Sequence, residues 1–278
     1  MKKVKNNIKW FESVDSTNNV AALSAQTDSD KTIYAAEFQT AGRGQKGNKW
    51  SSSKGENLTF SILLKPHFLT PISQSIITFI TTLGITKYLK ERLKEKREQI
   101  KIKWPNDIYV GNKKICGILI ENTILGERIE SSVVGIGLNV NQTIFSKELL
   151  NPTSLSLESN GEKFDTHIEL ERLADYIFEY YKKAEEIYKE DKGVKEICNE
   201  YLGNLFRFNQ MAKFVELGEI SAQKPVDTYS HNNEAFAKKN GKIIKAKIVG
   251  ITPQFLLILI HENGEQKEYA FKEIGYII

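Results

Sequence analysis

The chain has 278 residues, of which 40% are hydrophobic and 27% charged, a balance typical of a globular protein with one large domain or one large and one small domain. Its net charge of +4 is too small to indicate nucleic-acid binding without a focused basic patch. No run of about 18 apolar residues and no signal-peptide pattern occurs, so we expect a cytoplasmic protein without a membrane partner. The two cysteines, Cys116 and Cys198, form no CxxC pair, which disfavours a zinc site and suggests free thiols in a reducing compartment.

The N-terminal part of the chain predicts a strand, a helix and two further strands. The first strand is Ile8–Phe11 ("IKWF"), and the segment 15–26 ("DSTNNVAALSAQ") indicates a helix that Asp15 or Ser16 could cap. The further strands are expected at 32–37 ("TIYAAE") and 57–66 ("NLTFSILLKP"). Ser16, Thr17 and Asn18 stand at the start of this helix. Their presence there is explained by helix capping, and ligand binding is the alternative.

Between these two strands lies a loop, 40–52 ("TAGRGQKGNKWSS"), with three glycines, three positive charges and no regular periodicity. Glycines at this spacing let the backbone approach a ligand, and Gln39 follows a strand end, where open sheets place ligands. Arg43 stands between Gly42 and Gly44 and could close over such a ligand. The Walker spacing GxxxxGK[ST] is absent, and the GxGxxG match of "GRGQKG" is weak because no helical pattern follows. A flexible surface loop is the alternative.

A long helix is predicted over 71–93, where apolar residues recur at helical spacing and Pro71 suits the first turn. The segment 102–122 ("IKWPNDIYVGNKKICGILIEN") then predicts two β-rich runs joined by a hairpin turn at Gly111-Asn112. The densest charge run, 87–103, mixes glutamates with lysines and arginines at helical spacing, so a solvated helix face is expected there.

The polar residues of this hairpin are candidates for chemistry. Asp107, beside Asn106, could bind a hard cation through oxygen. Lys114 lies in an apolar strand, and an inward-facing lysine there needs a negative partner, such as an anionic ligand. The alternative is a lysine at a strand start that points to water. Cys116 is expected to act as a small buried hydrophobe.

The C-terminal half predicts one more buried strand, two helices and a separate β-rich unit. The strand is 131–141 ("SSVVGIGLNVN"), whose Gly135 and Gly137 expose backbone. Amphipathic helices follow, and the pattern then dissolves into an expected linker that has room for a short strand. The last residues predict four or five short strands with turns at Asn-Gly and Thr-Pro pairs. These segments are the helices 168–190 and 194–206, the linker 209–233 and the β-rich unit 234–278.

Taken together, these segments resemble the biotin–protein ligases, also called biotin–acetyl-CoA-carboxylase ligases. The resemblance covers residues 14–141 and consists of six pieces in order: "DSTN", "EFQTAGRGQKGNKW", "NLTFSILLKP", "KWPND", "KKICGILIE" and "GIGLNVN". Each piece alone occurs in unrelated proteins, but all six in this order are not expected by accident. The C-terminal β-rich segment is also similar to the small SH3-like domain that follows the ligase domain in this family.

The resemblance implies an α+β fold in which a mixed β-sheet with helices on one face, the class II synthetase-like biotin ligase fold, precedes a small C-terminal SH3-like β-barrel. The catalytic domain would span 1–208, the linker 209–233 and the barrel 234–278. The implied activity joins biotin to ATP with Mg²⁺, giving biotinyl-5′-AMP, and then transfers biotin to a lysine of a biotin carboxyl carrier domain of a carboxylase. The resemblance implies no nucleic-acid partner beyond the nucleotide and is compatible with a homodimer.

The resemblance also assigns roles to residues. Lys114 matches the lysine that contacts the biotin carboxylate, and with Arg43 and Asp107 it forms the expected catalytic set, without a set of protein ligands for a metal. Trp50 matches the tryptophan beside the adenine. The remaining expected contacts are Ser16, Thr17, Asn18 and Gln39 for biotin, Gly42, Arg43, Gly44 and Gln45 for the loop over biotin and the adenylate, Gly117 as a further ligand-binding position, and Asn106, Asp107 and Asn139 for the nucleotide side.

The sequence departs from the family pattern in the loop, and two other functions are alternatives. Gln45 and Asn48 stand where many members carry arginine, so the strength of adenylate retention is open. The motifs begin at Asp15, so we expect no DNA-binding winged helix of the kind that some members carry ahead of them. A lipoate–protein ligase shares the fold but generally has a histidine near its glycine-arginine loop, and none lies between 15 and 65. A non-catalytic biotin-binding regulator would need a DNA-reading element, which is not recognisable.

Overall fold

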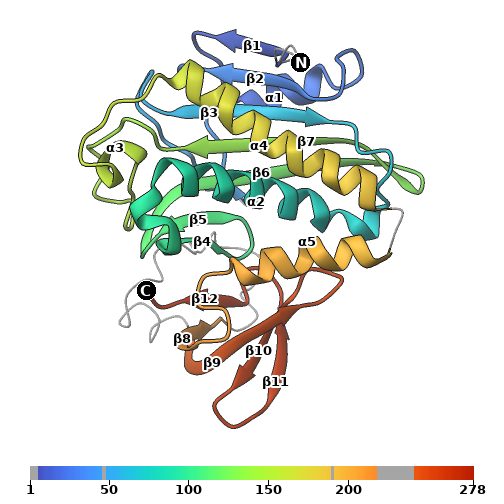
Figure 1. The fold of residues 1–278 in the computed structure, drawn as a ribbon, viewed down its shortest axis with the longest axis vertical. Coiled ribbons are helices and arrows are strands. Elements are labelled where there is room, and N and C mark those ends of the chain that lie inside the picture. Colours follow the sequence, from blue (N-terminus) through green and yellow to red (C-terminus); the bar gives the residue numbers. More distant parts are fainter. Residues whose placement is uncertain (1–5, 46–47, 189–190, 218–240) are drawn as a thin grey trace.

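The structure, a computed structural model, describes residues 6–45, 48–188, 191–217 and 241–278. Its larger sheet has seven strands in the described residues, in the order β1-β2-β3-β7-β6-β5-β4 (Figure 1). Because β1 pairs parallel to β2 and the other neighbours pair antiparallel, the predicted mixed sheet is confirmed. The strands are β1 Ile8–Phe11, β2 Thr32–Ala36, β3 Leu58–Leu64, β4 Ile100–Lys103, β5 Asp107–Val110, β6 Lys113–Leu125 and β7 Arg128–Leu138.

Two long helices, α2 (Ser75–Arg92) and α4 (Thr166–Ile187), pack side by side over one face of this sheet (Figure 1). The short helix α1 (Thr17–Leu23) lies against β2, β3 and β7. Its Ala21 packs with Tyr34, Leu63 and Val133 in a small cluster separate from the main core, so α1 covers the opposite face. The other helices that the described residues form in full are α3 (Leu155–Glu158), α5 (Asp191–Gly203) and the 3₁₀ turns Pro71–Ser73 and Lys94–Gln99.

The expected single helix at 71–93 is divided in two. Pro71 opens a 3₁₀ turn in which the Ser73 and Gln74 amides donate to carbonyls three residues earlier, at 2.9 and 3.3 Å, and α2 begins only at Ser75. Two β-rich runs were expected over 102–122, but the segment holds parts of three strands, β4, β5 and β6. The charge run 87–103, expected as a solvated helix face, is α-helical only to Arg92 and continues into a 3₁₀ turn and β4. The remaining predicted elements are found within a few residues of their expected ends. Among the described residues, no helix is both long and apolar enough to cross a bilayer.

Strand alternation divides the larger sheet into an apolar face and a partly polar face. In β3, Phe60 and Ile62 enter the main core, whereas Ser61 between them contacts α1. In β7, Ile136 enters the same core, and its neighbours Gly135 and Gly137 point to the α1 face. The α1 face therefore carries small and polar residues in the middle of the sheet.

In the described residues, the C-terminal unit is a five-stranded antiparallel sheet in the order β11-β10-β9-β8-β12. Its strands are β8 Met211–Glu216, β9 Lys242–Ile251, β10 Leu257–His261, β11 Gln266–Tyr269 and β12 Ile274–Tyr276. β8 lies inside the segment that was expected to be a linker. This segment forms a strand because Phe214 and Val215 are fully buried when it pairs in this sheet. The segment 209–217 is thus part of the C-terminal unit, and the rest of the expected linker lies outside the described residues.

Apolar contacts join the two sheets. Phe255, in the turn after β9, packs its ring against Phe79 of α2 and Tyr201 of α5, at centroid distances of 5.5 and 6.0 Å. Residues of the second sheet belong to the same core cluster as the first. The C-terminal unit therefore sits next to the β4 edge of the larger sheet (Figure 1).

Candidate active site

A cavity of about 190 Å³ gathers most of the predicted site residues. Its walls come from the start of α1, the loop 39–51, the strands β5, β6 and β7, and the segment 139–152. Two of the predicted residues, Gly42 and Asn106, do not line the cavity. The predicted residues that do line it are Ser16, Thr17, Asn18, Gln39, Arg43, Gly44, Gln45, Trp50, Asp107, Lys114, Gly117 and Asn139. The fold thus brings together segments that are more than 100 residues apart in the chain.

The floor of the cavity is a pair of glycines on adjacent strands. Gly117 of β6 lies opposite Gly137 of β7, and the indole ring of Trp50 lies across both. A Cβ atom on Gly137 would come within 2.2 Å of the ring, and one on Gly117 within 2.9 Å. Trp50 Nε1 is buried and has no hydrogen-bond partner among the described residues.

Lys114 meets Asp107 at one side of this floor. Lys114 Nζ lies 2.8 Å from Asp107 Oδ1, and the side chains keep 15% and 9% of their surface exposed. A β-bulge in β6 is responsible: Ile108 pairs with Cys116 but Tyr109 pairs with Lys114, so the intervening residue is unpaired. The bulge turns Lys114 toward Gly117, on the cavity face, while Cys116 stays in the core. The predicted inward-facing lysine and the buried cysteine are both found.

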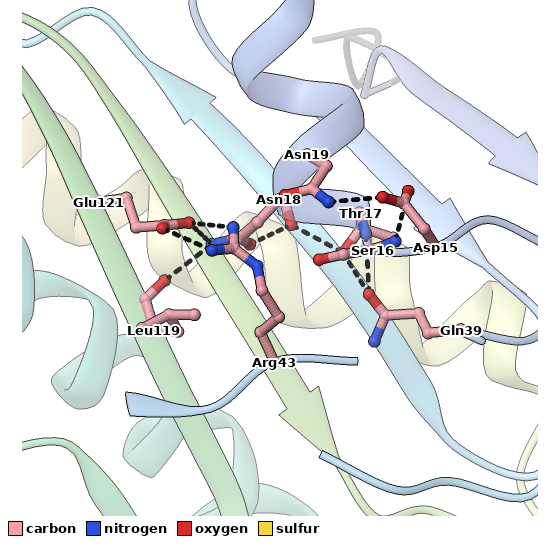
Figure 2. Close-up of polar contacts among 10 residues, drawn as sticks. Asp15, Ser16, Thr17, Asn18, Asn19, Gln39, Arg43, Leu119 and Glu121 are labelled. Carbon is pink, nitrogen blue, oxygen red and sulfur yellow. Dashed lines mark hydrogen bonds and ion pairs between the residues drawn. The ribbon is translucent and has the colours of Figure 1, made fainter. Parts of the chain in front are cut away.

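The start of α1 is capped by a residue other than the ones expected. Gln39 Oε1 accepts hydrogen bonds from the Thr17 amide at 2.8 Å and the Thr17 hydroxyl at 3.1 Å (Figure 2). The side chain of Ser16 makes no capping bond, and Asp15 Oδ1 accepts from the Ser16 amide at 2.7 Å. Because Gln39 takes over the capping, the Ser16 hydroxyl at the cavity wall is not used to cap the helix.

A chain of polar contacts continues from Thr17 to the loop (Figure 2). The Ser61 hydroxyl lies 2.7 Å from Thr17 Oγ1 and 2.6 Å from Asn18 Oδ1. Asn18 Nδ2 donates to Glu121 Oε2 at 2.7 Å, and Glu121 accepts two bonds from Arg43 at 2.7 and 3.0 Å. Sequence reasoning missed Ser61 and Glu121: both stand inside quoted motif pieces, "NLTFSILLKP" and "KKICGILIE", but as single polar residues in apolar strands they were given no role.

The loop itself is folded back through backbone hydrogen bonds. The Trp50 amide donates to the Gly42 carbonyl at 3.0 Å, and the Gly44 amide donates to the Asn48 carbonyl at 2.7 Å. A Cβ atom on Gly42 would lie 2.4 Å from the Trp50 carbonyl oxygen, which explains the glycine. Gln45 Oε1 and Asn48 Nδ2 are buried without hydrogen-bond partners among the described residues, and 46–47 lie outside them.

The two expected nucleotide-side asparagines have structural bonds. Asn106 Nδ2 donates to the Ile118 carbonyl, and the residue lines a smaller neighbouring cavity that also contacts Lys272 of the C-terminal unit. Asn139 Nδ2 donates to the Thr153 carbonyl at 2.9 Å and so holds the segment after β7 over the main cavity. That segment contributes apolar side chains that sequence reasoning missed, since their pattern has no period: Phe145, Leu149, Leu150 and Pro152.

The described residues contain no group of three or more histidines, cysteines, aspartates or glutamates that could hold a metal. Asp107 is the carboxylate that lines the cavity closest to Lys114, with which it is paired. A magnesium ion here would therefore be held mainly by substrate phosphates, which is how this ion commonly binds in nucleotide sites.

Residues 10–139 match the model of the biotin/lipoate A/B protein ligase family. Over these residues the chain is similar to the ligase domain that this family shares. Over 161 residues the chain is 34% identical to the bifunctional ligase/repressor BirA of Bacillus subtilis, covering 56% of the present chain and 48% of the relative. It is 31% identical over 126 residues to the biotin–[acetyl-CoA-carboxylase] ligase of Paracoccus denitrificans, covering 45% and 51%. The chain therefore spans about half the length of these curated relatives.

The likeness to a solved structure extends beyond the ligase domain. The biotin protein ligase of Aquifex aeolicus in complex with biotin and ATP superposes with a TM-score of 0.70 at 28% identity, and the match covers 97% of each chain. The ligase domain and the C-terminal sheet are thus arranged as in that enzyme.

Proposed function

We propose that the protein is an ATP-dependent biotin–protein ligase, which forms biotinyl-5′-AMP and transfers biotin to one lysine of a biotin carboxyl carrier domain. The observation that carries the proposal is the cavity with two different ends. A chain of short polar side chains lies at one end, and the cation of Lys114 lies at the other. The likeness to a ligase bound to biotin and ATP supports the same assignment.

The polar end suits the ureido ring of biotin, which presents one carbonyl acceptor and two N–H donors. The Ser16 hydroxyl, free of capping, can donate to the carbonyl or accept from an N–H group. The Asn18 amide is already held by Ser61 and Glu121, so it keeps one orientation toward the cavity. Small, rigid partners of this kind lose little entropy when the ligand binds.

The charged end suits the first chemical step. A carboxylate oxygen of biotin attacks the α-phosphorus of ATP, a new P–O bond forms, and the bond to the leaving pyrophosphate breaks. Negative charge develops on the phosphoryl oxygens, where the mostly buried Lys114 and the more exposed Arg43, which both line the cavity, can stabilise it. Magnesium bound to the phosphates would neutralise charge on the leaving group. Binding both reactants in one cavity supplies further acceleration through orientation.

The second step needs access from outside. The amine of the carrier lysine attacks the carbonyl carbon of the mixed anhydride, loses a proton, and AMP leaves. The cavity of about 190 Å³ is smaller than the ~300 Å³ of common ligand pockets, so part of its lining would shift to admit the adenylate. Such movement would cover the anhydride until the carrier arrives.

The test supplies the purified protein with ATP, Mg²⁺, a carrier domain, and either labelled biotin or labelled lipoate. We expect pyrophosphate release and the addition of biotin to a single carrier lysine, read by mass spectrometry. Incorporation of lipoate in preference to biotin would identify the alternative ligase. Biotin binding without pyrophosphate release would identify a regulator and refute the proposal.

A further inference from the structure

Glu121 occupies a special place on the cavity face of β6. It does not line the cavity, yet it contacts two residues that do, Asn18 from α1 and Arg43 from the loop (Figure 2). These two residues come from different segments, so a single carboxylate connects the helix start to the loop. Neither the motif pattern nor the chemistry of the proposed reaction assigns it a role.

The carboxylate is held from the inside of the protein. Asn18 keeps only 3% of its surface exposed. A Cβ atom on Gly135 would lie 2.1 Å from Asn18 Oδ1, so the glycine leaves room for the amide against the sheet. With its oxygen beside the Ser61 hydroxyl, the amide can only present its nitrogen to Glu121, at 2.7 Å. Glu121 is therefore oriented before Arg43 binds to it.

The geometry of the Arg43 pair leaves part of the guanidinium available. Nη1 bonds to Oε1 at 3.0 Å and Nη2 bonds to Oε2 at 2.7 Å, a two-point contact that fixes the plane of the group. A guanidinium carries five N–H donors, so three remain after this pairing. Arg43 lines the cavity, and a ligand anion can therefore bind to the same group from the other side.

We propose that Glu121 is a positioning residue, which holds the Arg43 guanidinium at the mouth of the cavity so that its remaining donors meet the anionic part of the substrate. This inference rests on the proposed ligase function. An exposed ion pair of this kind contributes little to stability, and both side chains are about 40% exposed. Its effect should therefore be on geometry and not on folding.

The first measurement needs no substrate and follows amide hydrogen exchange in Glu121→Gln. The amides of Gly44 and Trp50, bonded within the loop, should exchange about two- to fivefold faster, as expected when a contact of this strength is lost. The amides of Thr40 and Ala41, bonded to residues 14 and 15, should not change. Unchanged exchange at Gly44 and Trp50 would show that Glu121 does not hold the loop, whatever the activity of the protein.

The second measurement follows biotin-dependent pyrophosphate release. Glu121→Gln should lower kcat by about tenfold, the scale expected for a misplaced catalytic group, with a smaller change in the KM for biotin. In an Arg43→Ala background the same substitution should have no further effect on kcat, because the amide oxygen that replaces the carboxylate can still accept from Asn18 and only the contact with Arg43 is lost. Glu130→Gln, which removes an exposed carboxylate from β7, is the matched control and should leave the rate unchanged.

The outcomes separate the two proposals. If Glu121→Gln and Arg43→Ala lower the rate additively, Glu121 does not act through Arg43 and the inference is wrong. If Glu121→Asp fails to restore part of the rate lost in Glu121→Gln, the carboxylate itself is not what matters. If the unmodified protein releases no pyrophosphate, the ligase function fails, while the exchange measurement still decides whether Glu121 holds Arg43.

Discussion

Replacing Lys114 by methionine tests whether this side chain acts in chemistry or only in folding. Lys114→Met leaves the Asp107 carboxylate without the cation that lies 2.8 Å away. Breaking a fully buried ion pair costs about 3–5 kcal/mol. Because the two side chains keep 15% and 9% of their surface exposed, we expect a smaller cost of about 2–3 kcal/mol, at or just below the lower end of that range. The rate of adenylate formation should fall about 100- to 1,000-fold, as for the loss of one group placed at developing charge.

The assay combines urea unfolding with biotin-dependent pyrophosphate release. Adding Asp107→Asn to Lys114→Met removes the unpaired charge, so most of the lost stability should return while the rate stays low. Lys113→Met is the control, since that neighbouring side chain is 58% exposed and pairs only at 3.3 Å with Glu158. A normal rate of pyrophosphate release in Lys114→Met would refute the reasoning, and recovery of the rate with stability would reduce the lysine to a structural role.

Three further substitutions give separate tests. Gly137→Ala would place a Cβ 2.2 Å from the Trp50 ring and so displace the ring. Biotin binding, measured by calorimetry, should weaken at least about tenfold. Gly250→Ala is the control and should not weaken it, because a Cβ there would make only an ordinary contact at 3.6 Å. Burial lowers the pKa of Lys103 from 10.5 to about 8. Burying the protonated side chain therefore lowers the free energy of unfolding by its full amount below pH 8, and this destabilisation decreases as the pH rises from 8 toward 10.5. Lys103→Met should therefore be more stable at pH 7, by up to about 3 kcal/mol, and the advantage should shrink by pH 9.5 in denaturant unfolding; an advantage that does not change with pH would contradict this. Arg43→Gly should unfold like the unchanged protein but release biotinyl-5′-AMP faster, read as unselective labelling of lysines; equal release would show that the loop does not cover the adenylate.

Elements with a local cause could be predicted from the sequence. The strand Ile8–Phe11 is found at its predicted residues, and Gly111 makes the predicted hairpin turn with a φ of +57°. Strand alternation and helical spacing depend only on side chains a few residues apart, so they are visible without a fold. The ordered motifs also indicated which distant segments would meet, and the cavity does gather most of them.

Contacts between strands were beyond this reasoning, because they depend on register. Nothing local indicates that a bulge would turn Lys114 from the core face to the cavity face, or that Glu121 would lie beside Arg43. The capping of α1 by Gln39 likewise requires the loop and the helix to pack together.

The sequence by itself determined the elements, their order and the chemical types available to the site. The tertiary structure decided which of these groups are paired and which face the cavity. The physical reason is that a one-residue change in strand register moves a side chain to the other face of a sheet. Register is fixed by the packing of the whole core, to which β8 and the C-terminal sheet also contribute.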